Sequence, residues 1–148
     1  MSNYLDSIEE STNIVKSRIK LSKLILITSY LAVWVISLIV FWYFTSGSDA
    51  MGYGIVFLWV LLPCTTFVIS ILIGKNDYWG KYKWITSIAF GVMYMLAEYA
   101  TFSAANMISF DKVNMPQFSM IFIGAVISIA GLEIGVGIRR FKSKNLNK

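Results

Sequence analysis

Four long apolar runs, none of which contains a Lys or Arg, constrain the fold of this chain more than any other feature. They cover residues 24–44, 53–73, 84–108 and 120–138. About 20 apolar residues in a helix cross the roughly 30 Å hydrocarbon core of a bilayer. The sequence therefore predicts an all-α integral membrane protein, built as a four-helix transmembrane bundle.

The positions of the basic residues predict how this bundle is oriented. Twelve of the 13 Lys and Arg residues precede the first run, lie between the second and third runs, or follow the fourth, and Lys112 is the exception. Cytoplasmic segments of membrane proteins carry such an excess. We therefore expect a multi-pass protein of the cell membrane (an inner or plasma membrane) with both termini in the cytoplasm. The net charge of +5 favours anionic lipid headgroups as neighbours over nucleic acid.

Two flanking segments complete the predicted organisation. In residues 1–23 the apolar side chains of Ile8, Val15 and Ile19 fall on one helical face. This pattern predicts an amphipathic N-terminal helix at the cytoplasmic interface, and a solvated cap without a partner is the alternative. Residues 139–148 are predicted to form a basic cytoplasmic tail.

Glu98 is the most informative single residue, because a charged group at bilayer depth is costly and is a functional candidate by default. It shares a helical stripe with Ser87, Gly91, Tyr94 and Thr101. We expect this stripe to face the second and fourth helices, with Tyr94 in hydrogen-bond reach of the carboxyl group. Glu98 is then either a polar pin between helices or a site for a proton, a cation or a cationic substrate.

The fourth run presents two faces that suit contact with protein. Glu133, a second intramembrane acid, lies opposite a face of small residues, and its extension toward Arg140 would explain its presence. Small residues let helix backbones approach closely, so this face predicts packing inside the bundle or in a homodimer. The small residues are Gly124, Ser128, Gly131 and Gly135.

Pro63 interrupts the second run. Because proline lacks the backbone N–H, it frees a carbonyl one turn earlier, and the sequence predicts a helix kink. Trp59, Thr66 and Ser70 share its face, so we expect the second helix to present a partly polar side toward the stripe around Glu98.

Residues for catalysis are scarce. The chain has no histidine and one cysteine, Cys64, and its aspartates Asp49, Asp77 and Asp111 lie in connections rather than spans. These absences exclude an HExxH zinc site, a Ser–His relay and a pair of intramembrane aspartates. No catalytic, cofactor-binding or metal-ligating residue is predicted.

Two functions remain after these exclusions. The composition favours a non-enzymatic structural or accessory subunit, which would form a homodimer or bind a larger membrane partner. The alternative is a small dimeric transporter or channel that binds its proton, cation or cationic substrate at Glu98.

Overall fold

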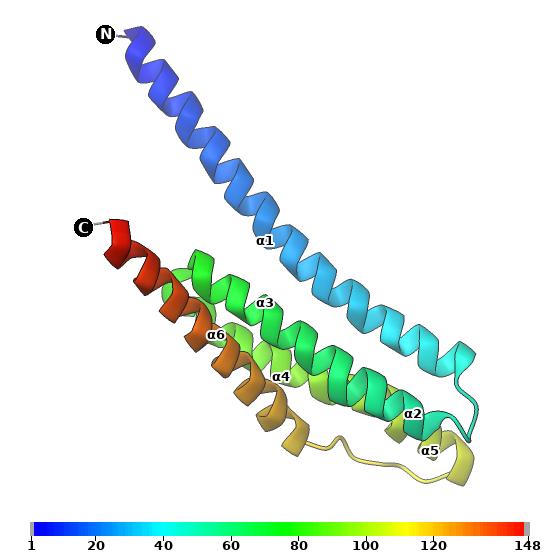
Figure 1. Ribbon diagram of the computed structural model, residues 1–148. Helices are drawn as coiled ribbons and strands as arrows, with labels where there is room; N and C mark the ends of the chain where they lie inside the picture. The colour runs from blue at the N-terminus through cyan, green and yellow to red at the C-terminus, as the bar shows by residue number, and fades with distance from the viewer. Residues whose placement is uncertain (1, 147–148) are drawn as a thin grey trace.

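The computed structural model describes the backbone of residues 2–146 and the side chains of residues 8–145. Within these residues the chain is helical, without strands, and four helices are long and apolar enough to cross a membrane. This confirms the predicted all-helical architecture with four spans. Both termini lie at the same end of the molecule, as Figure 1 shows. The four spans are Ile8–Phe44, Ala50–Asn76, Gly80–Phe110 and Ser119–Asn145.

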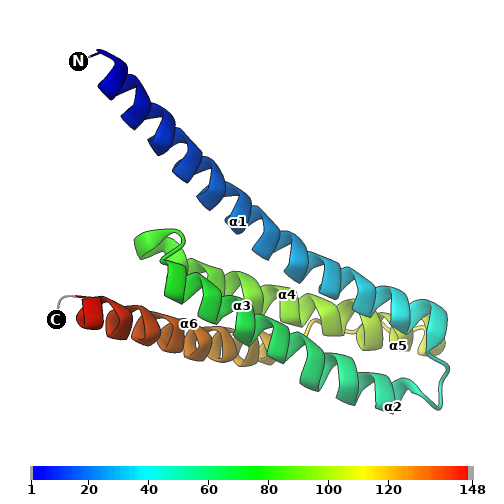
Figure 2. The same cartoon turned by 45° about the horizontal axis from the view of Figure 1, so that its top comes forward.

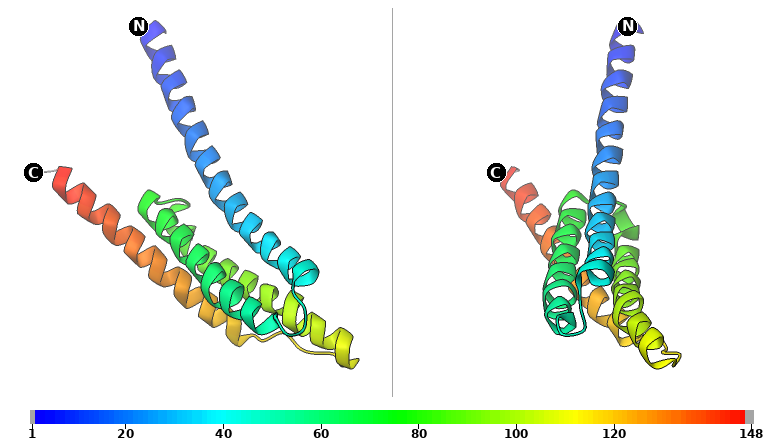
Figure 3. Two further views of the ribbon diagram at one scale, coloured as in Figure 1. Left: turned by 45° about the vertical axis from the view of Figure 1, so that its right-hand side comes forward. Right: turned by 90° about the vertical axis from the view of Figure 1, so that its right-hand side faces the viewer.

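The first span belongs to one continuous helix, α1 (Ser2–Phe44), of 43 residues. At 1.5 Å per residue it is roughly 65 Å long, about twice the thickness of the hydrocarbon core. The predicted boundary at residue 23 is therefore not marked by any break in the helix. The N-terminal part of α1 leans away from the other helices (Figure 1 and Figure 3). Its residues Ile8, Val15 and Ile19 are exposed, while residues 1 and 147–148 lie outside the described part.

The second span changes from a π-helix to an α-helix just before Pro63. Pro63 lies in the first turn of α3, where its missing N–H is least costly. Before it, the chain forms a π-helix, in which backbone bonds join residues five apart. The N–H of Leu62, for example, bonds the carbonyl of Phe57. The segments are α2 (Ala50–Tyr53), η1 (Gly54–Leu61) and α3 (Leu62–Asn76).

The third span also contains a π-helical turn, between α4 and α5, and the fourth is a single helix. The third ends at Asp111, whose left-handed backbone (φ 51°) terminates the helix. An irregular connection follows, with Val113 and Met115 strongly exposed. The elements are η2 (Gly80–Trp84), α4 (Ile85–Glu98), η3 (Tyr99–Ser103), α5 (Ala104–Phe110) and α6 (Ser119–Leu146).

The core of the bundle is formed by α3, α4 and α6, with α6 packed against both other helices. Figure 2 shows these three running together while α1 diverges toward its N-terminus. Glycines allow the close approach. A Cβ on Gly74 of α3 would collide with the backbone of α6 at Leu132, and one on Gly91 of α4 would collide with the α6 carbonyl of Ile121.

Side-chain donors hold α1 to the rest of the bundle. The indole N–H of Trp34 donates to the carbonyl of Met93 (2.9 Å), and that of Trp42 donates to the carbonyl of Ala100 (3.0 Å). Both acceptors lie on the third span. The buried hydroxyl of Tyr53, at the start of the second span, donates to the α1 carbonyl of Ser37 (3.0 Å). All three of these bonds involve the C-terminal half of α1.

Candidate functional site

Glu98 ends α4 and is 9% exposed. Its carboxyl group accepts hydrogen bonds from Ser103 Oγ, at 3.1 Å to Oε1 and 3.3 Å to Oε2. Residues five apart point in different directions on an α-helix, at about 100° per residue. The wider π-helical turn of η3 lies between them and brings the two side chains together.

The remaining polar groups around Glu98 come from the same helix and the connection after it. Thr101 Oγ1 donates to the carbonyls of Ala97 (2.7 Å) and Glu98 (3.2 Å). The Asn114 side chain, from the connection before α6, donates to the carbonyl of Ser103 at 3.5 Å. These hydrogen bonds therefore stay within the third span and the connection that follows it.

Tyr94 does not bond Glu98, so the expected pairing of these two residues is wrong. Its hydroxyl donates to the carbonyl of Leu58 at 2.7 Å, inside the π-helix η1 of the second span. Tyr94 faces the second span, one turn before Glu98, and the bond fastens the third span to the second.

Ser87, at the start of the same stripe, belongs to a chain of three buried hydroxyls. Ser128 Oγ of α6 lies 3.1 Å from Ser87 Oγ of α4 and 2.8 Å from Ser70 Oγ of α3. All three residues are at most 2% exposed. This chain joins the three core helices at one level, and Ser70 was expected only as part of a polar face. Trp59, placed on that face by the sequence, is instead 70% exposed.

The small face of α6 is occupied within the chain itself. A Cβ on Gly124 would lie 2.9 Å from Gly91 Cα of α4, and one on Gly131 would lie 2.6 Å from the Phe67 carbonyl of α3. One on Gly135 would collide with the α3 carbonyl of Ile71. The Gly131–Gly135 motif packs against α3, so this surface is not available to a second copy.

Glu133 lies on the opposite, exposed side of α6. Two ion pairs are formed among the described residues, and neither joins Glu133 to Arg140. The expected pairing of the acid with the basic end of its own helix is thus absent from residues 8–145. Beside it, Ala130 is exposed, and a Cβ on Gly137 would meet nothing within 4 Å.

An ion-pair network that was not predicted from the sequence joins the helix ends on the basic side. Asp77 accepts from Lys83 at 3.0 Å and from Arg139 at 2.5 Å. The hydrogen bond from Lys83, followed by that from Arg139, holds the pKa of the Asp77 carboxyl below its ordinary value. Asp77 also adopts a left-handed backbone (φ 51°) that ends α3, which Asp tolerates better than most residues.

The described residues contain no group of three or more His, Cys, Asp or Glu side chains that would hold a metal ion. Ser103 was missed from the sequence because a five-residue spacing signals a shared face only where the helix is π. Asn114 was missed because it lies in an irregular connection, where no helical spacing applies. Comparisons with protein-family models, curated protein sequences and solved structures give no match to this chain.

Proposed function

We propose that this protein is a non-enzymatic accessory subunit that contacts a membrane partner through the outward face of α6. The observation that carries the proposal is Glu133, an exposed carboxyl group within an apolar span that has no hydrogen bond or ion pair within residues 8–145. A partner that donates to this carboxyl group relieves the cost of a charge at bilayer depth. Ala130 and Gly137 leave space beside it for a second helix.

In this proposal Glu98 is a structural pin. Its carboxyl group is held by Ser103 of its own span. The apolar pocket between α1, α3 and α4 lies elsewhere, and Glu98 is not among its lining residues. The buried hydroxyls of Ser87 and Tyr94 are likewise bonded to neighbouring helices. This polar stripe stabilises the bundle by satisfying its own hydrogen bonds.

The location follows from the basic residues. We place the protein in the cell membrane with both termini in the cytoplasm, because the end of the molecule that carries the termini (Figure 1) also carries the clustered Lys and Arg residues. In the same proposal, the exposed N-terminal half of α1 contacts the cytoplasmic membrane surface with Ile8, Val15 and Ile19.

Cysteine crosslinking in native membranes tests the partner face. In a Cys64→Ser chain, which has no cysteine, Ala130→Cys places one thiol beside Glu133. The matched control, Ile88→Cys, places a thiol on an exposed part of α4. We expect a discrete adduct from Ala130→Cys only. An adduct of twice the chain mass identifies a homodimer, and an adduct of another mass identifies a different partner. Equal labelling of both variants, or none, contradicts the proposal.

One observation favours transport as a second candidate function. The second and third spans both contain π-helical turns, η1 and η3, and Tyr94 bonds a carbonyl of η1 one turn before Glu98. Such turns are frequent at functional sites. If Glu98 binds a proton or cation, purified protein in liposomes will carry a flux that Glu98→Gln abolishes. The accessory role predicts no flux in either protein and only a small change in thermal stability, because Gln also accepts from Ser103.

A further inference from the structure

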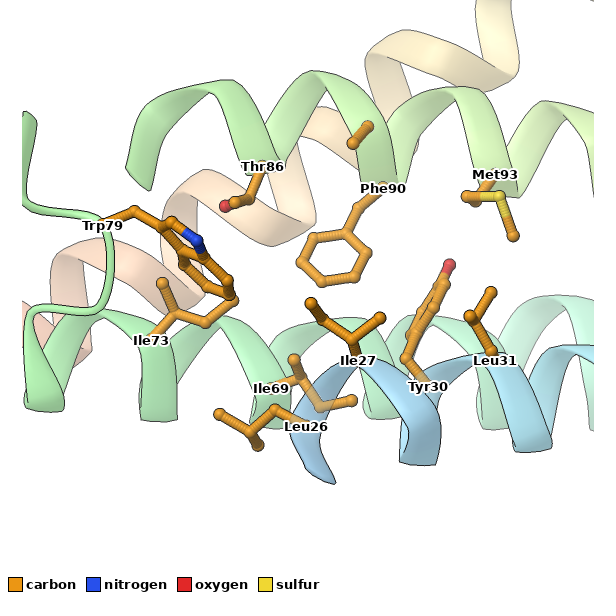
Figure 4. A pocket seen from close by; sticks show the side chains of 11 residues that line it. Leu26, Ile27, Tyr30, Leu31, Ile69, Ile73, Trp79, Thr86, Phe90 and Met93 are labelled. Atoms are coloured by element: carbon orange, nitrogen blue, oxygen red, sulfur yellow. The ribbon is translucent and has the colours of Figure 1, made fainter. Parts of the chain in front are cut away.

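An apolar pocket of about 240 Å³ lies between α1, α3 and α4, in the half of the bundle nearest the termini. Figure 4 shows its walls, which include Tyr30 of α1, Ile73 of α3, and Phe90 and Met93 of α4. The accessible wall consists entirely of apolar atoms. A cavity of about 150 Å³ with such walls stays dry and admits a small hydrocarbon. This pocket therefore suits a hydrocarbon chain rather than water or an ion.

The pocket reaches the lipid-facing side of the bundle. Three of its lining residues, Ile27 and Leu31 of α1 and Ala89 of α4, are exposed. All three lie within the candidate membrane spans. An occupant can enter sideways, from the hydrocarbon, between α1 and α4.

The end of the pocket nearest the basic connection carries a cation and an indole ring. Trp79 closes this end in Figure 4. The ammonium group of Lys23 lies 5.4 Å from the Trp79 ring centroid and 5.9 Å from that of Tyr78. The indole N–H of Trp79 makes no hydrogen bond within residues 8–145. Cation and donor together suit a phosphate group at the membrane interface.

The backbone around Trp79 holds the ring in this position. Trp79 has a left-handed conformation (φ 65°), which is unusual for a bulky residue. Backbone bonds from Gly80 to Asp77 (3.2 Å) and from Tyr82 to Trp79 (3.0 Å) fix the turn. Asp77 is itself held by its ion pair with Lys83. Uncommon backbone conformations of this kind persist where the surrounding structure enforces them, and they concentrate at binding sites.

We propose that this pocket binds one acyl chain of an anionic phospholipid, with the lipid phosphate at Lys23 and the Trp79 indole. The lipid comes from the leaflet on the side of the termini, where the basic residues would attract it. This inference does not rest on the proposed accessory function, because the pocket lies between α1, α3 and α4 and does not involve the Glu133 face of α6.

Native mass spectrometry of the delipidated full chain, titrated with phosphatidylglycerol or phosphatidylcholine, tests the site. We expect one phosphatidylglycerol to bind more tightly than phosphatidylcholine. Lys23→Gln should weaken it roughly five- to tenfold, as for one interfacial cation. Lys20→Gln, an exposed lysine of the same helix, is the matched control and should leave binding unchanged. Equal affinity for both lipids, or equal effects of both substitutions, overturns the proposal.

A second measurement tests whether the chain enters the pocket. Ala89→Trp places a bulky ring at its mouth, and Ile88→Trp places the same ring on the adjacent exposed position. Only Ala89→Trp should displace the lipid. Brominated phosphatidylglycerol, as a minor component of a phosphatidylcholine bilayer, should quench the tryptophan fluorescence of the native protein more than that of a Trp79→Phe variant. Binding that is unaffected by Ala89→Trp, or quenching that does not involve Trp79, overturns the proposal.

Discussion

Two buried tyrosines show how much a single hydroxyl group depends on its surroundings. The hydroxyl of Tyr94 donates to the carbonyl of Leu58. The hydroxyl of Tyr30 is buried beside Thr66 and makes no hydrogen bond of ordinary geometry within residues 8–145. Tyr94→Phe should lower the free energy of unfolding by about 1 kcal/mol. Tyr30→Phe should leave it unchanged or raise it, because no bond is lost. Thermal unfolding of both variants in detergent checks this, and an equal loss in the two would contradict it.

Asp77 gives a pH dependence whose sign follows from its ion pairs. Its pKa in the folded protein is lowered from 3.8 by Lys83 and Arg139. The stability that it contributes is therefore present above about pH 4 and is lost as the pH falls through the lowered value. Because the Asp77 side chain is 39% exposed, this contribution should stay below about 1 kcal/mol.

The Asp77→Asn variant isolates that contribution. At pH 7 the variant should unfold at a slightly lower temperature than the native chain, and the difference should shrink as the pH approaches 3. A difference that is the same at pH 7 and pH 3 would show that the Asp77 charge does not stabilise the fold. Lys81, an exposed basic residue of the same connection, provides a control through Lys81→Gln, which should show no such trend.

At the scale of the elements, glycines decide how closely α6 approaches its neighbours. A Cβ at Gly135 would collide with the backbone of α3, which cannot move aside, while a Cβ at Gly137 would meet open space. Gly135→Ala should therefore destabilise the bundle by about 1–3 kcal/mol. Gly137→Ala should not destabilise it. Unfolding measurements on the matched pair check this, and similar effects at both positions would exclude the close packing of α3 and α6.

The π-helical elements show a second way in which irregular geometry positions side chains. The widened turn η3 lies directly before α5 and brings the Ser103 side chain within hydrogen-bond distance of Glu98. Its carbonyl at Ala100 accepts from Trp42 of α1. Membrane helices tolerate such departures where neighbouring helices satisfy the backbone groups that they free. The site around Glu98 is thus built by a change of helix type within one span.

At the scale of the whole molecule, the orientation can be measured directly. In the Cys64→Ser background, Lys81→Cys and Ser143→Cys should react with an impermeant maleimide only after the membrane is opened. Ser48→Cys and Lys112→Cys should react in intact cells. All four positions are exposed, so access is set by the membrane side. The reverse pattern would place the termini outside and contradict the rule based on basic residues.

The four spans follow from the sequence because their signal is a sum over about 20 residues, which no single contact can override. The sequence also places the stripe of Ser87, Gly91 and Tyr94 on one face, since an α-helix repeats at a fixed angle. That angle held for these residues, which contact α6 or the second span.

Partners of individual side chains could be decided only by the tertiary structure. Glu98 meets Ser103 because a π turn alters the angle between them, and Glu133 is left exposed because the small residues of α6 turn its other face toward α3 and α4. Asp77, Lys83 and Arg139 meet because the ends of the second, third and fourth spans lie close together. Hydrophobic length is a local property of the chain, whereas these contacts depend on how the helices pack around one another.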